Sequence, residues 1–241
     1  MLIAKCVDEH FALSPRDEGQ FKKLLGNVEI ALVFVSTPNH PWTDTSKNDL
    51  FKVVYSSMEV IESEASRYGA PLSLDLVYFE YDSPYDYSYE DWTDLRWFDY
   101  GMKNYFYSDS FSNLIYKLEK TYKKDSYPLL FMFNSYSRSF SFIADKKSPL
   151  QNELNIYFCD KSLLHSNFLT HEFLHLYGAI DLYDYNEGEG IEEISKHYFP
   201  ESVMQDGKNR SIDELNAYLI GWLDYPTTNI LQFFSETEGI R

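Results

Sequence analysis

The chain has 241 residues, of which 44% are hydrophobic and 18% aromatic, and its formal net charge is -17 at pH 7. The hydrophobic and aromatic content excludes a disordered chain. The negative charge argues against nucleic acid or an anionic membrane surface as a partner, because both attract positively charged protein surfaces. The length fits one large domain. We expect a single domain over 1–241, with an N-terminal lobe to about residue 178 and a C-terminal lobe from about 179 to 241.

The two cysteines and the N-terminal residues narrow the class of protein further. Cys6 and Cys159 have neither the number nor the spacing of a disulfide framework or a cysteine metal site. Residues 1–19 contain no cationic stretch followed by a long apolar core, and no apolar run approaches the length of a membrane span. We therefore expect a cytoplasmic protein that has no membrane partner.

The first half of the chain predicts a crossover unit. Residues 28–37 are mostly apolar and β-branched, which is typical of a buried strand. Residues 46–69 carry apolar side chains at helical spacing and end at a glycine, which predicts a helix. Residues 71–82 again predict a strand. A strand, a helix and a strand of these lengths predict a right-handed crossover whose two strands are parallel.

The next segments predict more helices and strands. No element is predicted over 83–108, where Tyr, Trp and Phe are crowded among acidic residues; such aromatic density is more typical of packing than of a binding wall. A helix is predicted at 111–122, and strands at 128–134, 139–144 and 153–159. Together these segments predict an α/β (α+β) fold with a mixed twisted sheet and a crossover helix.

The C-terminal third predicts two helices joined by a loop. The first covers 163–178, where Ser162 or Ser166 can cap the start and Gly178 can end the helix. A loop follows from about 181 to 203. The last predicted helix covers 211–224, in which Ser211 and Glu214 form a capping-box pattern.

The segment LTHEFLHLYGAID, residues 169–181, places polar side chains in an otherwise apolar helix. His171 and His175 are four residues apart, so they lie on one helix face and can present two imidazoles to one metal ion. Glu172 stands one turn back from the second histidine, where its carboxylate can reach a water on the metal without being a ligand. Catalytic zinc usually has three protein ligands. Gly178 can turn the chain sharply so that Asp181 returns as the third.

The pattern HExxHxxGxxD at 171–181 resembles the zinc-binding pattern of the metzincin metallopeptidases, HExxHxxGxxH, in the version ending in Asp that snapalysin-like enzymes have. The resemblance implies Zn²⁺ held by His171, His175 and Asp181. Met204, in ESVMQDG, would be the methionine of the turn beneath the metal. The resemblance also implies a metzincin-like fold with an active-site helix and a small C-terminal lobe. The 139–144 strand would then pair with an extended peptide or protein substrate by strand addition.

The sequence also departs from the metzincin pattern. Some metzincins have a metal-reaching Tyr two residues after the turn methionine, whereas Asp206 stands there in this chain. Another group must then stabilise the oxyanion, and the candidates are His197, Tyr183 and Tyr198. An aspartate ligand adds negative charge, which makes the metal a weaker Lewis acid than three histidines would.

These features predict a zinc metalloendopeptidase. Zinc would polarise the scissile carbonyl and its bound water, and Glu172 would act as general base and pass the proton to the leaving amine. The alternative is a catalytically silent protein that holds zinc for structure or to bind a peptide. A third ligand from Glu192 or Glu193 also remains open.

Other polar residues of this region have simpler interpretations. His165 points away from the face shared by the two histidines, which indicates a capping or surface role. An acidic group after the motif does not have the spacing of a calcium-binding loop and is expected to be solvated. Its members are Asp184, Asn186, Glu187 and Glu189.

Overall fold

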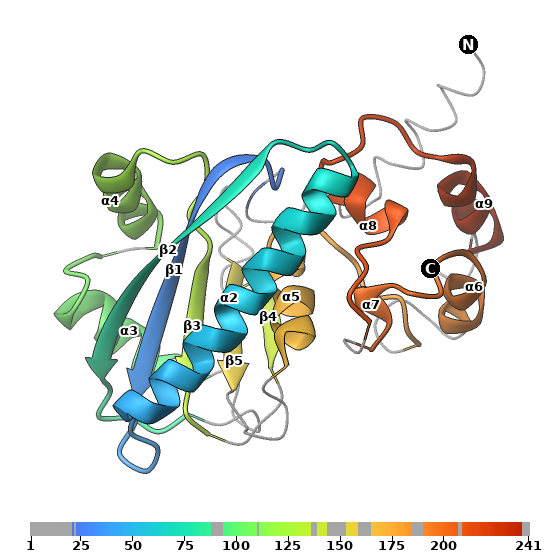
Figure 1. The fold of residues 1–241 in the computed structure, drawn as a ribbon. Coiled ribbons are helices and arrows are strands. Elements are labelled where there is room, and N and C mark those ends of the chain that lie inside the picture. Colours follow the sequence, from blue (N-terminus) through green and yellow to red (C-terminus); the bar gives the residue numbers. More distant parts are fainter. Residues whose placement is uncertain are drawn as a thin grey trace.

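The structure is a computed structural model. It describes residues 21, 23–87, 94–109, 111–135, 139–143, 153–158, 165–184, 190–206 and 209–237. The elements in chain order are β1 (Gly26–Ser36), α2 (Asp44–Arg67), β2 (Leu72–Asp82), α3 (Arg96–Asn104), α4 (Phe111–Tyr122), β3 (Leu129–Phe133), β4 (Phe140–Ile143), β5 (Glu153–Phe158), α5 (Ser166–His175), α6 (Ile191–Tyr198), α7 (Val203–Asp206), α8 (Glu214–Leu219) and α9 (Thr228–Thr237). Figure 1 shows them along the chain.

The described strands form one sheet in the order β2-β1-β3-β5-β4. β1 pairs in parallel with β2 and β3, β3 pairs in parallel with β5, and β4 runs antiparallel at the edge. The predicted mixed α/β sheet is therefore confirmed. The strands that precede and follow helix α2 in the sequence also form the predicted parallel pair. The three strands predicted after 122 correspond to β3, β4 and β5.

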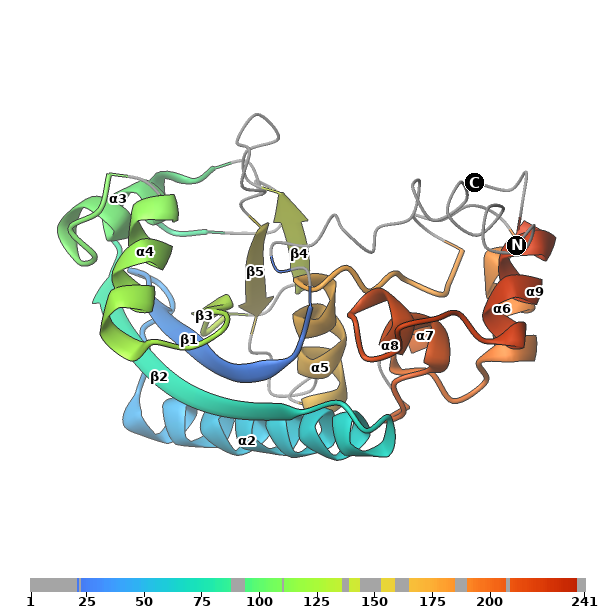
Figure 2. The ribbon, with the colours of Figure 1, turned by 90° about the horizontal axis from the view of Figure 1, so that it is seen from above.

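Helices cover both faces of this sheet, which explains the unbroken apolar run of β1. One face contributes Val28, Ile30, Leu32 and Phe34 to a core that contains buried residues of α2 and α5. The alternate residues of β1 pack in a second core with α3 and α4. In Figure 2 the long helix α2 lies under the sheet, and α3 and α4 lie on the opposite side.

The second core contains most of the described aromatic residues of the segment after β2, while Tyr105 and Tyr107 are exposed. Trp97 of α3 is fully buried and meets the rings of Phe131 and Phe133 edge-on. The Tyr81 hydroxyl donates a hydrogen bond to the Trp97 carbonyl over 3.1 Å. The prediction of packing is therefore confirmed for these buried rings. Helix α3 itself was not predicted, because it has only nine residues and Gly101 on its buried face lowers the helix propensity.

Two predictions for the region after Asp181 are wrong. The expected loop contains helix α6, whose backbone is held near its start by Asp184, which accepts a hydrogen bond from the Glu192 amide over 2.7 Å. Ile191 and Ser195 give α6 a small buried face. Asp184 is thus a structural acceptor rather than merely solvated. Residues 185–189 lie outside the described ranges.

The capping box predicted from Ser211 and Glu214 is also wrong. Asp213 caps α8 by accepting a hydrogen bond from the Asn216 amide over 2.9 Å, and Glu214 is the first helical residue. Ser211 stays extended because its carbonyl accepts the Val203 amide over 2.8 Å. Helix α8 is therefore shorter than the predicted 211–224, and a further helix, α9, follows it.

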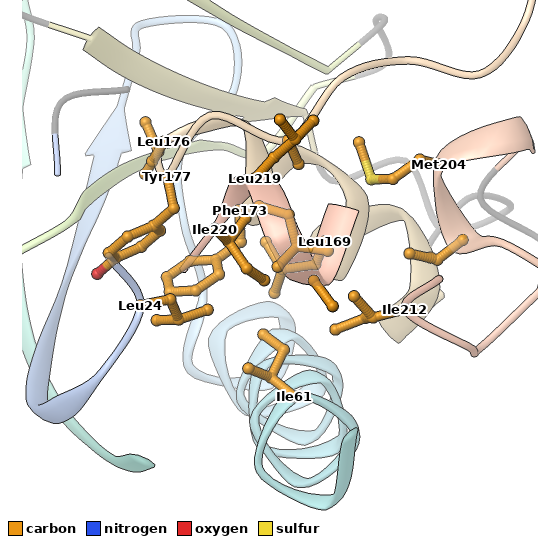
Figure 3. Close-up of a cluster of buried hydrophobic side chains, with 14 of the residues drawn as sticks. Leu24, Ile61, Leu169, Phe173, Leu176, Tyr177, Met204, Ile212, Leu219 and Ile220 are labelled. Atoms are coloured by element: carbon orange, nitrogen blue, oxygen red, sulfur yellow. The ribbon is translucent and has the colours of Figure 1, made fainter. Parts of the chain in front are cut away.

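The main core joins the sheet to the C-terminal region. Figure 3 shows Phe173 of α5 between Ile61 of α2 and the pair Leu219 and Ile220 at the end of α8. Met204 of α7 belongs to the same buried cluster. Helix α5 is thus packed on several sides before any ligand is considered. No helix in the described ranges is both long and apolar enough to cross a membrane.

The C-terminal end of α2 is tied to the segment that leads into α8. The Glu64 carboxylate accepts hydrogen bonds from the Ile212 amide over 2.7 Å and from Arg67 Nη2 over 2.6 Å. Arg67 and Tyr68 in turn donate to the Ile212 carbonyl over 2.7 Å and 2.9 Å. The crossover helix and the C-terminal region are therefore joined by charge-assisted hydrogen bonds as well as by apolar contact.

We expect Glu64→Ala to lower the free energy of unfolding by about 1 to 3 kcal/mol, because it leaves the Ile212 amide without its acceptor and removes the ion pair with Arg67. Urea unfolding measures the change. The matched control on the same helix is Lys52→Ala, which breaks an exposed ion pair with Asp49 and should cost about 0.5 kcal/mol or less. Equal losses in the two variants would contradict the role assigned to Glu64.

Candidate metal centre

Helix α5 carries the two histidines and is fixed by its buried face. Leu169, Phe173 and Leu174 are buried, and the Thr170 hydroxyl lies 2.7 Å from that of Ser57 on α2. Of the two predicted capping residues, Ser162 lies outside the described ranges, and Ser166 is wrong, since the N-cap position is His165, which makes no capping hydrogen bond through its side chain. Ser166 already lies inside the helix, where its carbonyl accepts the Thr170 hydroxyl.

Gly178 ends this helix in the left-handed conformation, as predicted, with φ of 91°. The Ala179 amide donates to the Leu174 carbonyl over 3.2 Å, and the Gly178 amide donates to the His175 carbonyl over 2.9 Å. These two bonds are those of a Schellman motif, which needs a positive φ that glycine adopts without strain. The motif reverses the chain and returns Asp181 toward the helix.

The structure brings together the three predicted ligands. His171 Nε2 lies 3.1 Å from Asp181 Oδ1, His175 Nε2 lies 3.3 Å from the same oxygen, and the two Nε2 atoms are 3.2 Å apart. His171 and Asp181 are buried, while 20% of the His175 side chain is exposed. Three potential ligand atoms therefore form a nearly equilateral triangle below the surface, able to hold a metal ion.

The other nitrogen of each imidazole faces a backbone carbonyl. His171 Nδ1 lies 3.1 Å from the Val203 oxygen, and His175 Nδ1 lies 2.8 Å from the Ala179 oxygen. A carbonyl only accepts, so each Nδ1 carries a hydrogen and each neutral Nε2 presents a lone pair. When both imidazoles are neutral, two lone pairs and a carboxylate oxygen converge on one point, and these groups repel one another unless a proton or a metal ion lies between them.

The dimensions and chemistry of this triangle fit zinc. Zinc bonds of 2.0 to 2.2 Å in a tetrahedron place neighbouring ligand atoms about 3.3 to 3.5 Å apart, close to the 3.1 to 3.3 Å found here. Imidazole nitrogens suit zinc and other transition metals, whereas calcium and magnesium prefer oxygen ligands. The carbonyl partners of both Nδ1 atoms are the usual outer support of metal-binding histidines.

The electrostatics of the cluster show the same need for positive charge. Burial opposes a charge on His175, but the Asp181 carboxylate and, less strongly, Glu172 raise the pKa of His175 to about 9. Burial likewise opposes a charge on Asp181, yet the two imidazoles hold its pKa far below the usual range. In the absence of a metal, the cluster therefore holds a proton, which a metal ion must displace.

Glu172 lies on α5 between the two histidines and is half-buried. Its influence on the pKa of His175 places its charge near the cluster. The group of possible ligand atoms does not include it. Glu172 thus stands beside the triangle while remaining partly accessible to water.

Met204 is fully buried and lies in the short helix α7. Its carbonyl accepts the Leu182 amide over 2.9 Å, and the carbonyl of its neighbour Val203 faces His171. The segment around Met204 therefore supports both the helix histidine and the chain beside Asp181. Gly207, which ends the ESVMQDG segment of the predicted methionine turn, lies outside the described ranges.

The remaining candidates are distributed unevenly around the centre. The Tyr183 ring lies 6.3 Å from that of His171, with 22° between their planes. His197 is exposed, and the Tyr198 hydroxyl donates to Glu236 over 2.6 Å. Glu192 pairs with Lys196, while Glu193 is exposed. In the described part of the chain, the metal-ligand group contains Asp181 and neither of these two glutamates.

The sequence could not reveal the groups that hold these ligands. Two of them are backbone carbonyls, of Val203 and Ala179, which leave no trace in residue types. Another is the Asn216 side chain, which accepts a hydrogen bond from the Ile180 amide over 2.8 Å. The helical pattern of 211–224 gave the only signal for Asn216, as a polar residue close to the apolar face.

A scan against protein-family models found no match for this chain, and a search of curated proteins also found none. A search of solved structures found the crystal structure of metalloproteinase-II from Bacteroides fragilis, with 14% sequence identity and a TM-score of 0.44. The match covers 82% of this chain and 53% of that one, so the chain spans about half the length of that protein. The chemistry of the site follows from its own residues.

We expect the purified protein to contain about one transition-metal ion per chain, and Asp181→Ala to lose it, because one of the three converging atoms is removed. Elemental analysis after dialysis without chelator measures the content. Glu192→Ala and Glu193→Ala, made separately, are the controls and should keep the metal. If either glutamate variant lost the metal while Asp181→Ala kept it, the third ligand would be that glutamate of α6 and not Asp181.

Proposed function

We propose that this protein is a zinc-dependent metallopeptidase of metzincin type, with His171, His175 and Asp181 as ligands. The proposal rests on the convergence of two imidazole lone pairs and one carboxylate oxygen beside a partly exposed glutamate on the same helix. Zinc held there would supply Lewis acidity, polarising the scissile carbonyl and making a water more acidic.

The side chains around the centre can perform the proton transfers of amide hydrolysis. Glu172 accepts a proton from the attacking water and delivers it to the nitrogen of the leaving amine. Its half-buried position beside His175 suits both transfers, because the carboxylate stays near the reacting atoms and still meets solvent. The carbonyls on each Nδ1 keep the two imidazoles aimed inward while the proton moves.

Two features favour a catalytic centre over a zinc site that only supports structure. Structural zinc usually has four protein ligands and no open position, whereas the metal-ligand group found among the described residues has three members. His175 and Glu172 are also partly exposed, so water reaches the cluster from their side. A base beside the metal has no purpose in a closed structural site.

Among the three candidates for oxyanion stabilisation, the structure favours Tyr183. It follows Asp181 by two residues, and its ring lies alongside His171. Tyr198 is already engaged with Glu236, and His197 is exposed on α6. We therefore assign to the Tyr183 hydroxyl the donation of a hydrogen bond to the developing oxyanion.

Strand β4 is the proposed substrate edge. It is the outermost strand beside β5, it runs antiparallel to its neighbour, and it contacts α5. An extended peptide paired with this edge would lie next to the helix that carries Glu172. Because a strand edge binds the main chain along its length, the proposal includes cleavage within a chain rather than removal of a terminal residue.

We expect Glu172→Gln to keep zinc at the parent level and to lose at least about a hundredfold in kcat, because the amide cannot accept the water's proton. Zinc content and cleavage of a mixed peptide library are measured on the same preparation. A variant that retains its zinc and cleaves at the parent rate would contradict the role of Glu172. A zinc-loaded parent without any cleavage would favour the silent binding protein.

We expect Tyr183→Phe to lower kcat by about 10- to 1000-fold with little change in KM, because the hydroxyl acts mainly in the transition state. Tyr198→Phe is the matched control, since it removes the same hydroxyl from a residue hydrogen-bonded to Glu236. Steady-state kinetics on one cleaved peptide gives kcat and KM for both variants. Equal activities of the two variants would remove Tyr183 from the mechanism.

A further inference from the structure

Asp181 comes from a loop, and the residues on both sides of it are held by hydrogen bonds. On one side, the Ile180 amide donates to Asn216 Oδ1 over 2.8 Å. On the other side, the Leu182 amide donates to the Met204 carbonyl over 2.9 Å. The two contacts fix the backbone at both neighbours of Asp181, so the carboxylate has little freedom to leave the two histidines.

These two contacts are joined through three buried polar side chains, Ser202, Asp213 and Asn216, which we call the polar bridge. Asp213 Oδ2 accepts the Ser202 hydroxyl over 2.5 Å and Asn216 Nδ2 over 2.9 Å. The Met204 amide donates to Ser202 Oγ over 3.0 Å. All three side chains are buried. The bridge thus runs from Asn216, through Asp213 and Ser202, to the backbone of Met204.

The hydrogen bonds of the bridge fix the orientation of each member. Asn216 must turn Nδ2 toward the Asp213 carboxylate, which leaves Oδ1 facing the Ile180 amide. Ser202 gives its hydrogen to Asp213 and therefore offers a lone pair to the Met204 amide. A buried network in which every member is satisfied is rigid, because any rotation leaves a polar group without a partner.

We propose that Ser202, Asp213 and Asn216 are positioning residues that hold Asp181 in the geometry required for metal binding. The inference rests on the metal centre of the proposed function. The bridge connects the amide before Asp181 to the segment that binds the amide after it. The same segment supplies the Val203 carbonyl that orients His171. One network therefore reaches both the loop ligand and the first histidine.

A simpler role for Asp213 is helix capping, since Asp213 Oδ1 also accepts the Asn216 amide at the start of α8. Capping alone would not require Ser202 or the second carboxylate oxygen. Asp213→Asn separates the two roles. Asparagine caps a helix well with its one oxygen, but its amide nitrogen then faces Asn216 Nδ2, so the shared acceptor of the bridge is lost.

The test compares Ser202→Ala and Asp213→Asn with Ser126→Ala. Ser126 is also a buried serine, and its hydroxyl lies 2.8 Å from that of Tyr177, outside the bridge. Zinc affinity is measured by competition with a chromophoric chelator, and the visible spectrum of the cobalt(II) form reports coordination geometry. Urea unfolding of the metal-free proteins gives the purely structural effect of each substitution.

We expect both bridge variants to bind zinc roughly 10- to 100-fold more weakly and to alter the cobalt spectrum, while Ser126→Ala keeps the parent affinity and spectrum. Parent-like affinity in Ser202→Ala, with only a loss of metal-free stability, would overturn the proposal even if Asp213→Asn did not fold. A parent without metal would overturn it together with the metal centre. Lack of peptide cleavage by the metal-loaded parent would count against the proposed function alone.

Discussion

The structure around residues 171–181 is organised by one electrostatic constraint. Two imidazole nitrogens and a carboxylate oxygen meet within 3.3 Å of one another at a largely buried point. Such a convergence is unfavourable without a positive charge, and burial increases the penalty. A proton on His175 removes the repulsion when no metal ion is bound, and the surrounding hydrogen bonds fix the positions of the three groups. The surrounding fold therefore holds a geometry that requires a positive charge, supplied by that proton on His175 in the absence of a metal ion.

The half of this constraint that is local in sequence could be predicted. Helical spacing places His171 and His175 on one face, and Gly178 adopts the left-handed conformation that returns the chain. Both depend on residues a few positions apart. The strand-helix-strand unit was predictable for the same reason, because its apolar periods are continuous and each element ends at a clear signal.

The other half depends on contacts between distant segments and could not be predicted. The main partner of Ile180 is Asn216, and that of Leu182 is a backbone carbonyl, so neither leaves a recognisable spacing. Asp213 illustrates how a local rule misleads. The capping-box rule pointed to Ser211 and Glu214, but the Ser211 backbone already pairs with Val203, and the nearby carboxylate takes the cap. Helix α6 was missed because its buried face has few apolar residues.

The three proposed ligands are held in place in two different ways. The histidines lie on a helix that packs against α2, α7 and the strands β4 and β5, so their positions follow from the core. Asp181 lies in a loop, and its position follows from polar contacts with α7 and α8. Metal binding at the proposed site would therefore stabilise the packing of the C-terminal region against α5, because an ion that prefers the assembled site favours the state in which all three proposed ligands meet. The Glu64 contacts with Ile212 extend this coupling to the crossover helix. With Asp181 as the proposed third ligand, metal binding and the folding of the C-terminal region would be thermodynamically coupled.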